Sequence, residues 1–169
     1  MKIKIELTDT FYTSIERAFK APILGDATKF LNGYRFQPPI TGFEEDQTWG
    51  QLNGIRYPVT NGNFWLSKGR IFTDKILERN ENEFWKWMIY DFKIGMMFFT
   101  RKAIGEWKVL ESEPNRIVVS YSYTFYSKNI FLHLCTLLFC HLQWKGMMGK
   151  AIKGIKLQAE SNLPFVYER

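Results

Sequence analysis

The feature that most constrains the fold is a single long helix at the end of a series of strand-like segments. Residues 130–160 predict one helix of about 30 residues, or about 45 Å, apolar on every side in its first half and with lysines on one face in its second half. The preceding segments predict strands near residues 42–49, 52–60, 66–78, 83–93, 100–112 and 116–127. Short turn sequences separate them, and short connections require antiparallel neighbours, because a parallel return needs a long crossover.

The start of the chain predicts one more strand, followed by short helices. Apolar and polar residues alternate over residues 10–19, Ala21-Pro22 ends this strand, and residues 22–31 predict one or two short helices. The sheet then has about six to seven strands and a single long helix to cover one of its faces. This combination predicts an α+β protein in which a curved antiparallel sheet wraps around the C-terminal helix.

Length and composition are typical of one globular unit. A chain of 169 residues with 46% apolar and 24% charged residues predicts a single domain over residues 1–169 and excludes a disordered chain. Fifteen Phe, eight Tyr and six Trp exceed what a core of this size needs. Aromatic walls are typical of concave apolar ligand sites, but aromatic residues also favour strands, so both explanations remain open.

The charge pattern bears on the possible partners. The net charge is +6, yet no run of Lys or Arg exceeds two residues, so the sequence lacks the basic groove of a nucleic-acid binder. An anionic lipid surface fits this charge better, and solubility alone is the simplest explanation of it. Cys135 and Cys140 lie too far apart around a helix to bridge, which predicts reduced thiols and a cytoplasmic protein. The first twelve residues lack the pattern of a signal peptide, and residues 130–142 are too short to span a bilayer.

Several short phrases, in this order, resemble a known superfamily over nearly the whole chain. The sequence is similar to the START-like, or SRPBCC, superfamily, whose helix-grip fold is shared by birch-pollen-allergen-like proteins, lipid-transfer START domains and the polyketide cyclase group. The order of the phrases carries the resemblance, since each one alone is a weak signal. The phrases are FKAP (19–22), GIRYPV (54–59), DKIL (74–77), FWKWMIYDF (84–92), AIGEWKV (103–109), RIVVSYSYTF (116–125) and WKGMMGKAIKGIKLQAE (144–160).

The resemblance implies a pocket between the sheet and the terminal helix for a hydrophobic molecule such as a lipid, quinone, steroid or polyketide. It does not imply catalysis, because the superfamily mixes carriers, receptors, cyclases and hydroxylase partners. The chain has Asp74 where many members carry Glu after the third strand, and it lacks the Cys-x-His ligands of the iron–sulfur relatives. We therefore expect no redox centre and no cofactor.

Arg56 and Asp74 are the first candidates for a functional pair, because the resemblance places them on adjacent strands. In a cavity, a guanidinium held by a carboxylate fixes the polar end of an apolar ligand; on the outer face, the same pair is a surface salt bridge of little consequence. Both alternatives remain open. Asp74 and His133 are the acid–base candidates, and with Arg56 they complete the possible catalytic set. A metal site is not expected, because only His133 and Cys140 among the His and Cys residues of the helix share a face.

The terminal helix and the last strand predict the remaining walls of the pocket. At 100° per residue, one stripe of the helix faces the sheet, with Trp144, Met147 and Met148 as a roof. The stripe contains His133, Leu137, Cys140, Trp144, Met147, Met148, Ala151 and Ile155. The ligand-binding residues predicted on strands are Trp107, Tyr121, Tyr123 and Phe125, and Gly105 predicts a bulge or bend.

The opposite face of the first half of the helix is also apolar, which a soluble monomer rarely leaves exposed. Three explanations are open: the loop at residues 30–42 covers this face, a homodimer contact buries it, or it makes a peripheral contact with a membrane. The face contains Phe131, Leu132, Cys135, Leu138, Phe139 and Leu142.

Three functions are consistent with these patterns. The first is binding or transport of a hydrophobic small molecule without catalysis. The second is a cyclase or aldolase-like enzyme acting on such a molecule, in which Arg56, Asp74 or His133 assists proton movement. The third is an interaction module that uses the apolar first half of the terminal helix. A cavity of a few hundred Å³ would favour the first two over the third.

Overall fold

The computed structural model describes residues 1–64, 67–93, 98–161 and 167. The strands within these ranges are β1 (Lys2–Phe11), β2 (Ile40–Glu45), β3 (Ile55–Thr60), β4 (Gly69–Arg70), β5 (Thr73–Asn80), β6 (Phe84–Tyr90), β7 (Thr100–Glu113) and β8 (Arg116–Ser127). The helical segments are α1 (Ile15–Leu24), a 3₁₀ turn (Ala27–Lys29), α2 (His133–Phe139), a π-helical turn (Cys140–Trp144) and α3 (Lys145–Glu160).

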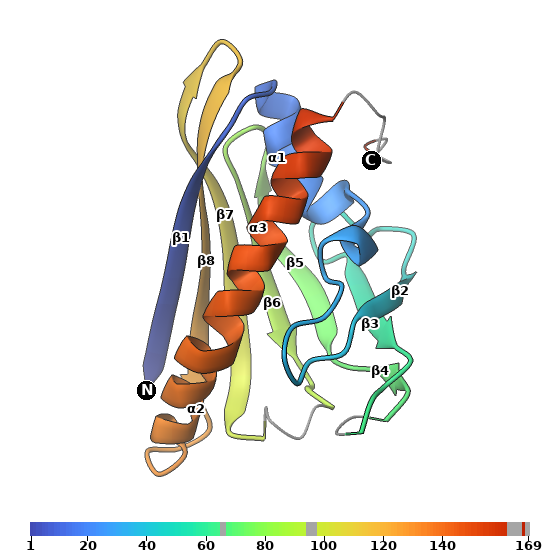
Figure 1. Ribbon diagram of the computed structural model, residues 1–169, viewed down its shortest axis with the longest axis vertical. Coiled ribbons are helices and arrows are strands. Elements are labelled where there is room, and N and C mark those ends of the chain that lie inside the picture. The colour runs from blue at the N-terminus through green and yellow to red at the C-terminus, as the bar shows by residue number, and fades with distance from the viewer. Residues whose placement is uncertain (65–66, 94–97, 162–166, 168–169) are drawn as a thin grey trace.

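The strands form one antiparallel sheet with the order β1-β8-β7-β6-β5-β3-β2, and β4 pairs with β3. β1 pairs with β8 along its whole length, which brings the first strand beside the last. Figure 1 shows the sheet curving around α3, which runs across it from α2 to α1. The predicted α+β helix-grip arrangement, a curved antiparallel sheet around a long C-terminal helix, is confirmed. The strand predicted over residues 66–78 is two strands, β4 and β5, with Ile71 and Phe72 between them.

The first strand lies earlier in the sequence than predicted. A strand over residues 10–19 is wrong, because β1 ends at Phe11 and α1 begins at Ile15. Ser14 starts α1: its hydroxyl oxygen accepts a hydrogen bond from the backbone N–H of Arg17 at 3.3 Å. Apolar residues in this region fit a spacing of two and a helical spacing equally well. The segment that pairs with β8 is residues 2–11, which also alternate and begin before the predicted strand. Residues 15–24 are therefore outside the sheet and form a helix.

α1 accepts hydrogen bonds from three indole N–H groups, two of them on strands of the sheet and one in the connection between β2 and β3. Pro22 lies inside α1 and has no N–H to donate to the carbonyl of Ala18, four residues earlier. The indole nitrogen of Trp107, on β7, donates to that carbonyl at 3.1 Å. Two further indoles donate to carbonyls of the same helix: Trp85 to Phe19 at 2.8 Å and Trp49 to Ile23 at 3.1 Å. The indoles of Trp107 and Trp49 thus satisfy carbonyls that Pro22 and the helix end leave without a helical donor.

The terminal helix is continuous over residues 133–160 but contains a π-helical turn. In that turn the backbone N–H of Lys145 donates to the carbonyl of Cys140, five residues earlier. The extra residue rotates the first half of the helix relative to the second, so angles extrapolated at 100° per residue fail across it. Phe139, predicted on the outer face, is therefore buried against Phe99 and Phe125, with ring centroids 5.5 and 6.1 Å away. Leu134, which was not predicted there, is exposed.

Candidate functional site

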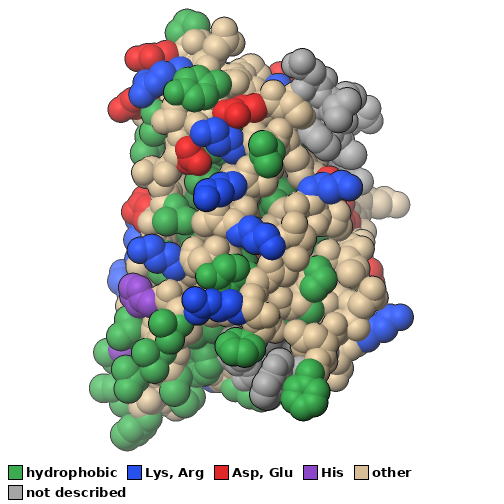
Figure 2. Space-filling model, in the orientation of Figure 1, with side chains coloured by type: hydrophobic (Ala, Val, Ile, Leu, Met, Phe, Trp, Pro, Cys, Tyr) green, Lys and Arg blue, Asp and Glu red, His purple; other side chains and the backbone are tan. Residues whose placement is uncertain are grey.

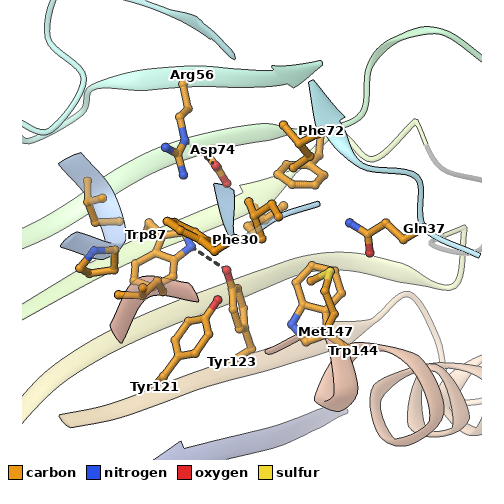
Figure 3. A pocket seen from close by; sticks show the side chains of 16 residues that line it. Phe30, Gln37, Arg56, Phe72, Asp74, Trp87, Tyr121, Tyr123, Trp144 and Met147 are labelled. Atoms are coloured by element: carbon orange, nitrogen blue, oxygen red, sulfur yellow. Dashed lines mark hydrogen bonds and ion pairs between the residues drawn. The ribbon is translucent and has the colours of Figure 1, made fainter. Parts of the chain in front are cut away.

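A small cavity lies between the sheet and α3, at the place that the resemblance implied. Its volume is about 40 Å³, and Figure 3 shows the sixteen side chains that line it. Aromatic residues of the sheet form one wall, Trp144 and Met147 of the terminal helix form another, and Phe30 and Gln37 close it from the segment after α1. This volume holds about one water molecule, whose share of the liquid is about 30 Å³. Among the described residues, the expected cavity of a few hundred Å³ is therefore not present at this place, which by the criterion given above favours the interaction module; a larger guest requires the lining side chains to move.

Arg56 and Asp74 form a buried ion pair at the edge of this cavity. They lie directly opposite each other on β3 and β5, and Arg56 Nε donates to Asp74 Oδ2 at 2.9 Å. Arg56 is 6% and Asp74 3% exposed, so the surface salt bridge is excluded. The guanidinium also lies over the rings of Phe43 and Trp49, 4.5 and 4.1 Å from their centroids. This packing orients the cation without using the second carboxylate oxygen.

That second oxygen, Asp74 Oδ1, is buried and has no hydrogen-bond partner among the described residues. Burial raises the pKa of Asp74 above its ordinary value of 3.8, and the charge and hydrogen bond of Arg56 only partly oppose this shift. Both side chains extend from the sheet toward the aromatic groups of the cavity (Figure 3). Asp74 thus offers an unused acceptor, or a proton-binding oxygen, to whatever occupies this space.

Three aromatic side chains form the sheet wall and carry its polar groups. Trp87 Nε1 donates to Tyr123 Oη at 3.1 Å, and the ring centroids of Tyr121 and Tyr123 are 5.5 Å apart. Burial raises the pKa of Tyr121 to about 12, and burial with the neighbouring Tyr121 raises the pKa of Tyr123 well above its ordinary value. Both phenols are therefore neutral at physiological pH and can donate or accept a hydrogen bond.

Gly105 makes room for this wall. It pairs in regular register with Trp87 on β6 and Tyr123 on β8, and the register shifts of β7 lie elsewhere, so the predicted bulge at Gly105 is wrong. A Cβ atom there would lie 2.3 Å from the Trp87 ring. The missing side chain lets the indole lie flat over β7, a close approach that only glycine allows.

Trp144 supplies the second unpaired polar atom of the cavity. The π-helical turn ends at this residue, whose ring lies 5.2 Å from that of Tyr123 and 5.1 Å from that of Phe125. Its Nε1 is buried and has no hydrogen-bond partner in the part of the chain that the structure describes. The cavity is thus lined by two side chains that each carry a buried polar atom without a partner among the described residues: a donor on Trp144 of the helix and an acceptor, Oδ1, on Asp74 of the sheet.

The segment between the 3₁₀ turn and β2 closes the cavity beside the terminal helix. The carbonyl of Tyr34 accepts from Gln143 Nε2 at 2.6 Å, and that of Gly33 accepts from Lys150 Nζ at 2.9 Å. A Cβ atom at Gly154 would lie 2.4 Å from Cβ of Phe30, so the missing side chain lets this segment approach α3 closely. The segment is joined to the helix by a few hydrogen bonds and by Phe30, rather than by strand pairing.

The structure places only some of the predicted site residues around the cavity. Arg56, Asp74, Tyr121, Tyr123, Trp144 and Met147 line it. Trp107, Phe125, Leu137 and Met148 do not. Trp107 is committed to Ala18 of α1, Phe125 is covered by the ring of Trp144, and Leu137 and Met148 lie on parts of the helix that face other core residues. These four residues lie outside the lining of this cavity, and their role in ligand binding stays a prediction.

His133 also lies away from the cavity. His133 begins α2, and its Nδ1 is 3.0 Å from the hydroxyl of Ser127 at the end of β8. It does not line the cavity, so it cannot act on a group beside Asp74. The sequence reasoning missed Trp87, Phe72, Phe30 and Gln37, which line the cavity. The alternation of β6 carried a signal for Trp87, whereas the other three lie between regular elements, where no periodicity points inward.

The described residues contain no group of three or more His, Cys, Asp or Glu side chains placed to hold a metal ion. Within the same ranges, the helices are too short or too polar to cross a membrane.

No protein-family model matches the sequence, and no curated protein matches it either. Solved structures do share its fold. Norcoclaurine synthase from Thalictrum flavum, in complex with dopamine and hydroxybenzaldehyde, aligns with a TM-score of 0.68 and 12% identity over 97% of this chain and 90% of that chain. Ara h 8.0201 aligns with a TM-score of 0.66 and 16% identity, over 96% of this chain and 100% of that chain.

The Zhui aromatase/cyclase from a Streptomyces species aligns with a TM-score of 0.63 and 10% identity, over 95% of this chain and 94% of that chain. Identities this low establish the fold and not the activity. The fold is the helix-grip fold of START-like proteins, as the sequence phrases predicted.

Proposed function

We propose that this protein binds a hydrophobic small molecule that carries polar groups, between the curved sheet and the C-terminal helix. The observation that carries the proposal is the pair of unpaired buried atoms, Asp74 Oδ1 and Trp144 Nε1, in one aromatic cavity. Proteins pair nearly all of their buried polar groups, so two unpaired atoms on side chains that line the same cavity favour a partner that supplies both a donor and an acceptor.

The chemistry of the walls narrows the class of ligand. A hydroxyl or amino group of the ligand donates to Asp74 Oδ1, and a carbonyl or ether oxygen accepts from Trp144 Nε1. The neutral phenols of Tyr121 and Tyr123 serve either role. A hydroxylated quinone, steroid or polyketide-like ring system meets these demands better than a plain acyl chain. Dopamine and hydroxybenzaldehyde, present in the norcoclaurine synthase complex, are rings with polar substituents of this kind.

Binding requires the cavity to enlarge. At about 40 Å³ it is far below the roughly 300–1,000 Å³ of typical ligand pockets, so Phe30, Met147 or the segment that follows the 3₁₀ turn must move aside. Methionine has several rotatable bonds and adapts readily, and among the described residues the segment has no strand pairing to α3 or to the sheet that would have to break. A ligand that opens this space gains the burial of its apolar surface against the aromatic rings of the lining.

Native mass spectrometry of the purified protein, followed by solvent extraction, tests the proposal. We expect a retained molecule of a few hundred daltons, and we expect Asp74→Asn and Trp144→Phe to weaken its retention about tenfold or more, because each removes one polar contact. Glu44→Gln is the matched control, since Glu44 pairs with Arg70 on the exposed edge of the sheet. Retention that is equal in all four proteins would contradict the assignment of the site.

One observation favours a second function, a cyclase or aldolase-like enzyme. Asp74 has a raised pKa and a free oxygen beside the cavity, which are properties of a general acid or base, and Arg56 lies next to it to stabilise a developing anion. An aromatase/cyclase is among the proteins of this fold. The test offers a poly-β-ketone substrate to the wild type and to Asp74→Asn. Conversion by the wild type, with normal binding but no conversion by Asp74→Asn, would establish the enzyme. Binding without conversion by the wild type would leave the carrier function.

A further inference from the structure

The end of the molecule that carries α2 exposes large apolar side chains. Five of them, between 50% and 89% exposed, form what we call the α2 patch: Ile130, Phe131, Leu134, Leu138 and Leu142. Figure 2 shows hydrophobic side chains gathered at this end, where they form a projecting surface rather than a flat face. The segment after the 3₁₀ turn lies beside Leu138 and Leu142, where Arg35 Nη1 donates to the carbonyl of Leu142 at 2.7 Å, and it leaves both side chains at least half exposed. The loop at residues 30–42 therefore does not cover the face, contrary to one of the three explanations.

Two loops extend the apolar surface. Phe98, 68% exposed, precedes β7, and the ammonium of Lys128 lies 5.9 Å from the centre of its ring. Phe36, 54% exposed, shares an apolar groove of about 380 Å³ with Leu138 and Leu142, and Phe99 and Phe139 form part of its lining. Three segments far apart in the sequence thus place apolar groups on the same end of the protein. An exposed apolar surface of this extent marks an interaction site.

The segments that carry the α2 patch contain basic residues and no acidic ones. The sequence contains no Asp or Glu between Glu113 and Glu160, and none between Asp26 and Phe43. Exposed basic residues flank the patch along the chain, in these segments and at the start of β7. They include Arg35, Arg101, Lys128, Lys145 and Lys150. Figure 2 shows blue side chains and no red ones next to the apolar end on this face. The chemistry of this surface therefore suits a partner that offers an apolar region to the patch and negative charges to the basic residues beside it.

We propose that the α2 patch docks the protein on an anionic phospholipid bilayer. The side chains of the patch enter the interfacial region, and Lys128, Lys145 and Arg101 contact lipid phosphates, as in peripheral proteins that combine an apolar helix face with flanking cations. A second copy of the chain fits less well, because a symmetric contact through the patch brings these cations against their own copies without a carboxylate to pair with. This docking does not depend on what the cavity binds.

Vesicle flotation of the full-length protein tests the proposal. We expect the wild type to float with phosphatidylcholine vesicles that contain about one-third phosphatidylserine and to stay behind with phosphatidylcholine alone. Raising the salt from about 0.1 M to about 1 M shortens the screening length from about 10 Å to about 3 Å and should release most of the bound protein. Leu138→Glu should lower the bound fraction at least about tenfold, because it places a carboxylate at the centre of the patch.

Leu157→Glu is the matched control, since Leu157 is 72% exposed on α3, outside the patch, and should leave flotation unchanged. Phe131→Glu, at an 89% exposed position before α2, repeats the test if Leu138→Glu does not fold, as circular dichroism would reveal. Wild type that fails to float at low salt, or a patch variant that floats like Leu157→Glu, overturns the proposal. A dimer by light scattering that Leu138→Glu dissociates, together with no flotation, overturns it in favour of a second copy.

Discussion

The indole N–H of Trp107 donates a hydrogen bond to the carbonyl of Ala18, the group in α1 that Pro22 leaves without its helical donor. The indole is fully buried, and its ring packs edge-on against Phe11 at 5.6 Å between centroids. A residue that the sequence suggested for ligand binding is thereby used to dock the first helix. The three indole contacts of α1 explain part of the unusual tryptophan content of the chain.

Trp107→Phe should lower the free energy of unfolding by about 1–3 kcal/mol, because it leaves the Ala18 carbonyl buried and unpaired. In a Pro22→Ala background the new backbone N–H of residue 22 can bond the same carbonyl, so the cost of Trp107→Phe should fall. Urea unfolding of the four proteins measures this difference as a coupling free energy. An equal cost in both backgrounds would show that the indole contributes by packing alone.

Gly105→Ala should destabilise the protein by about 1–3 kcal/mol, because the added Cβ lies 2.3 Å from the Trp87 ring, which must leave its place over β7. Displacement of Trp87 should also change the indole fluorescence. Gly149→Ala is the matched control: a Cβ atom on this α3 residue meets nothing within 4 Å, so it should be neutral or stabilising by up to about 1 kcal/mol. Equal unfolding midpoints for the two variants would contradict the close approach.

Arg56→Met should cost about 3–5 kcal/mol of stability, because it leaves the buried Asp74 without its counter-ion. The double variant Arg56→Met/Asp74→Leu should regain most of that loss, since an apolar pair needs no compensation for burial. Chemical denaturation of both variants provides the comparison. If the double variant is less stable than Arg56→Met, the ion pair is not the origin of the cost.

The contribution of Asp74 to stability should decrease as the pH rises through the range where Asp74 titrates. Because burial raises the pKa of Asp74 above 3.8, the folded protein holds this proton more tightly than the unfolded chain. The contribution of Asp74 is therefore most favourable below pH 3.8 and is lost as the pH rises through the folded-state pKa. Asp74→Asn should remove this component from the pH profile of urea unfolding. An NMR titration of the Asp74 carboxyl with a midpoint below 3.8 would reverse the sign.

Much of the fold follows from local patterns in the sequence. Turn residues between alternating segments predicted the antiparallel strands, and the apolar spacing of residues 130–160 predicted the terminal helix, because both signals arise within one element and its own turns. The pairing of Arg56 with Asp74 was also expected, through the resemblance. The region of β1 and α1 was not predicted correctly, since residues 10–19 fit two periodicities and only the pairing with β8 separates them.

The sequence by itself determined the order of the elements, the antiparallel sheet and the helix that it surrounds. Only the tertiary structure decided that the cavity is about 40 Å³, that Trp107 serves α1 while Trp87 and Phe30 line the cavity, and that Phe139 is buried at the π-helical turn while Leu134 is exposed. The physical reason is that periodicity reports the face of an element, whereas the space left between faces depends on how side chains from distant segments fill it.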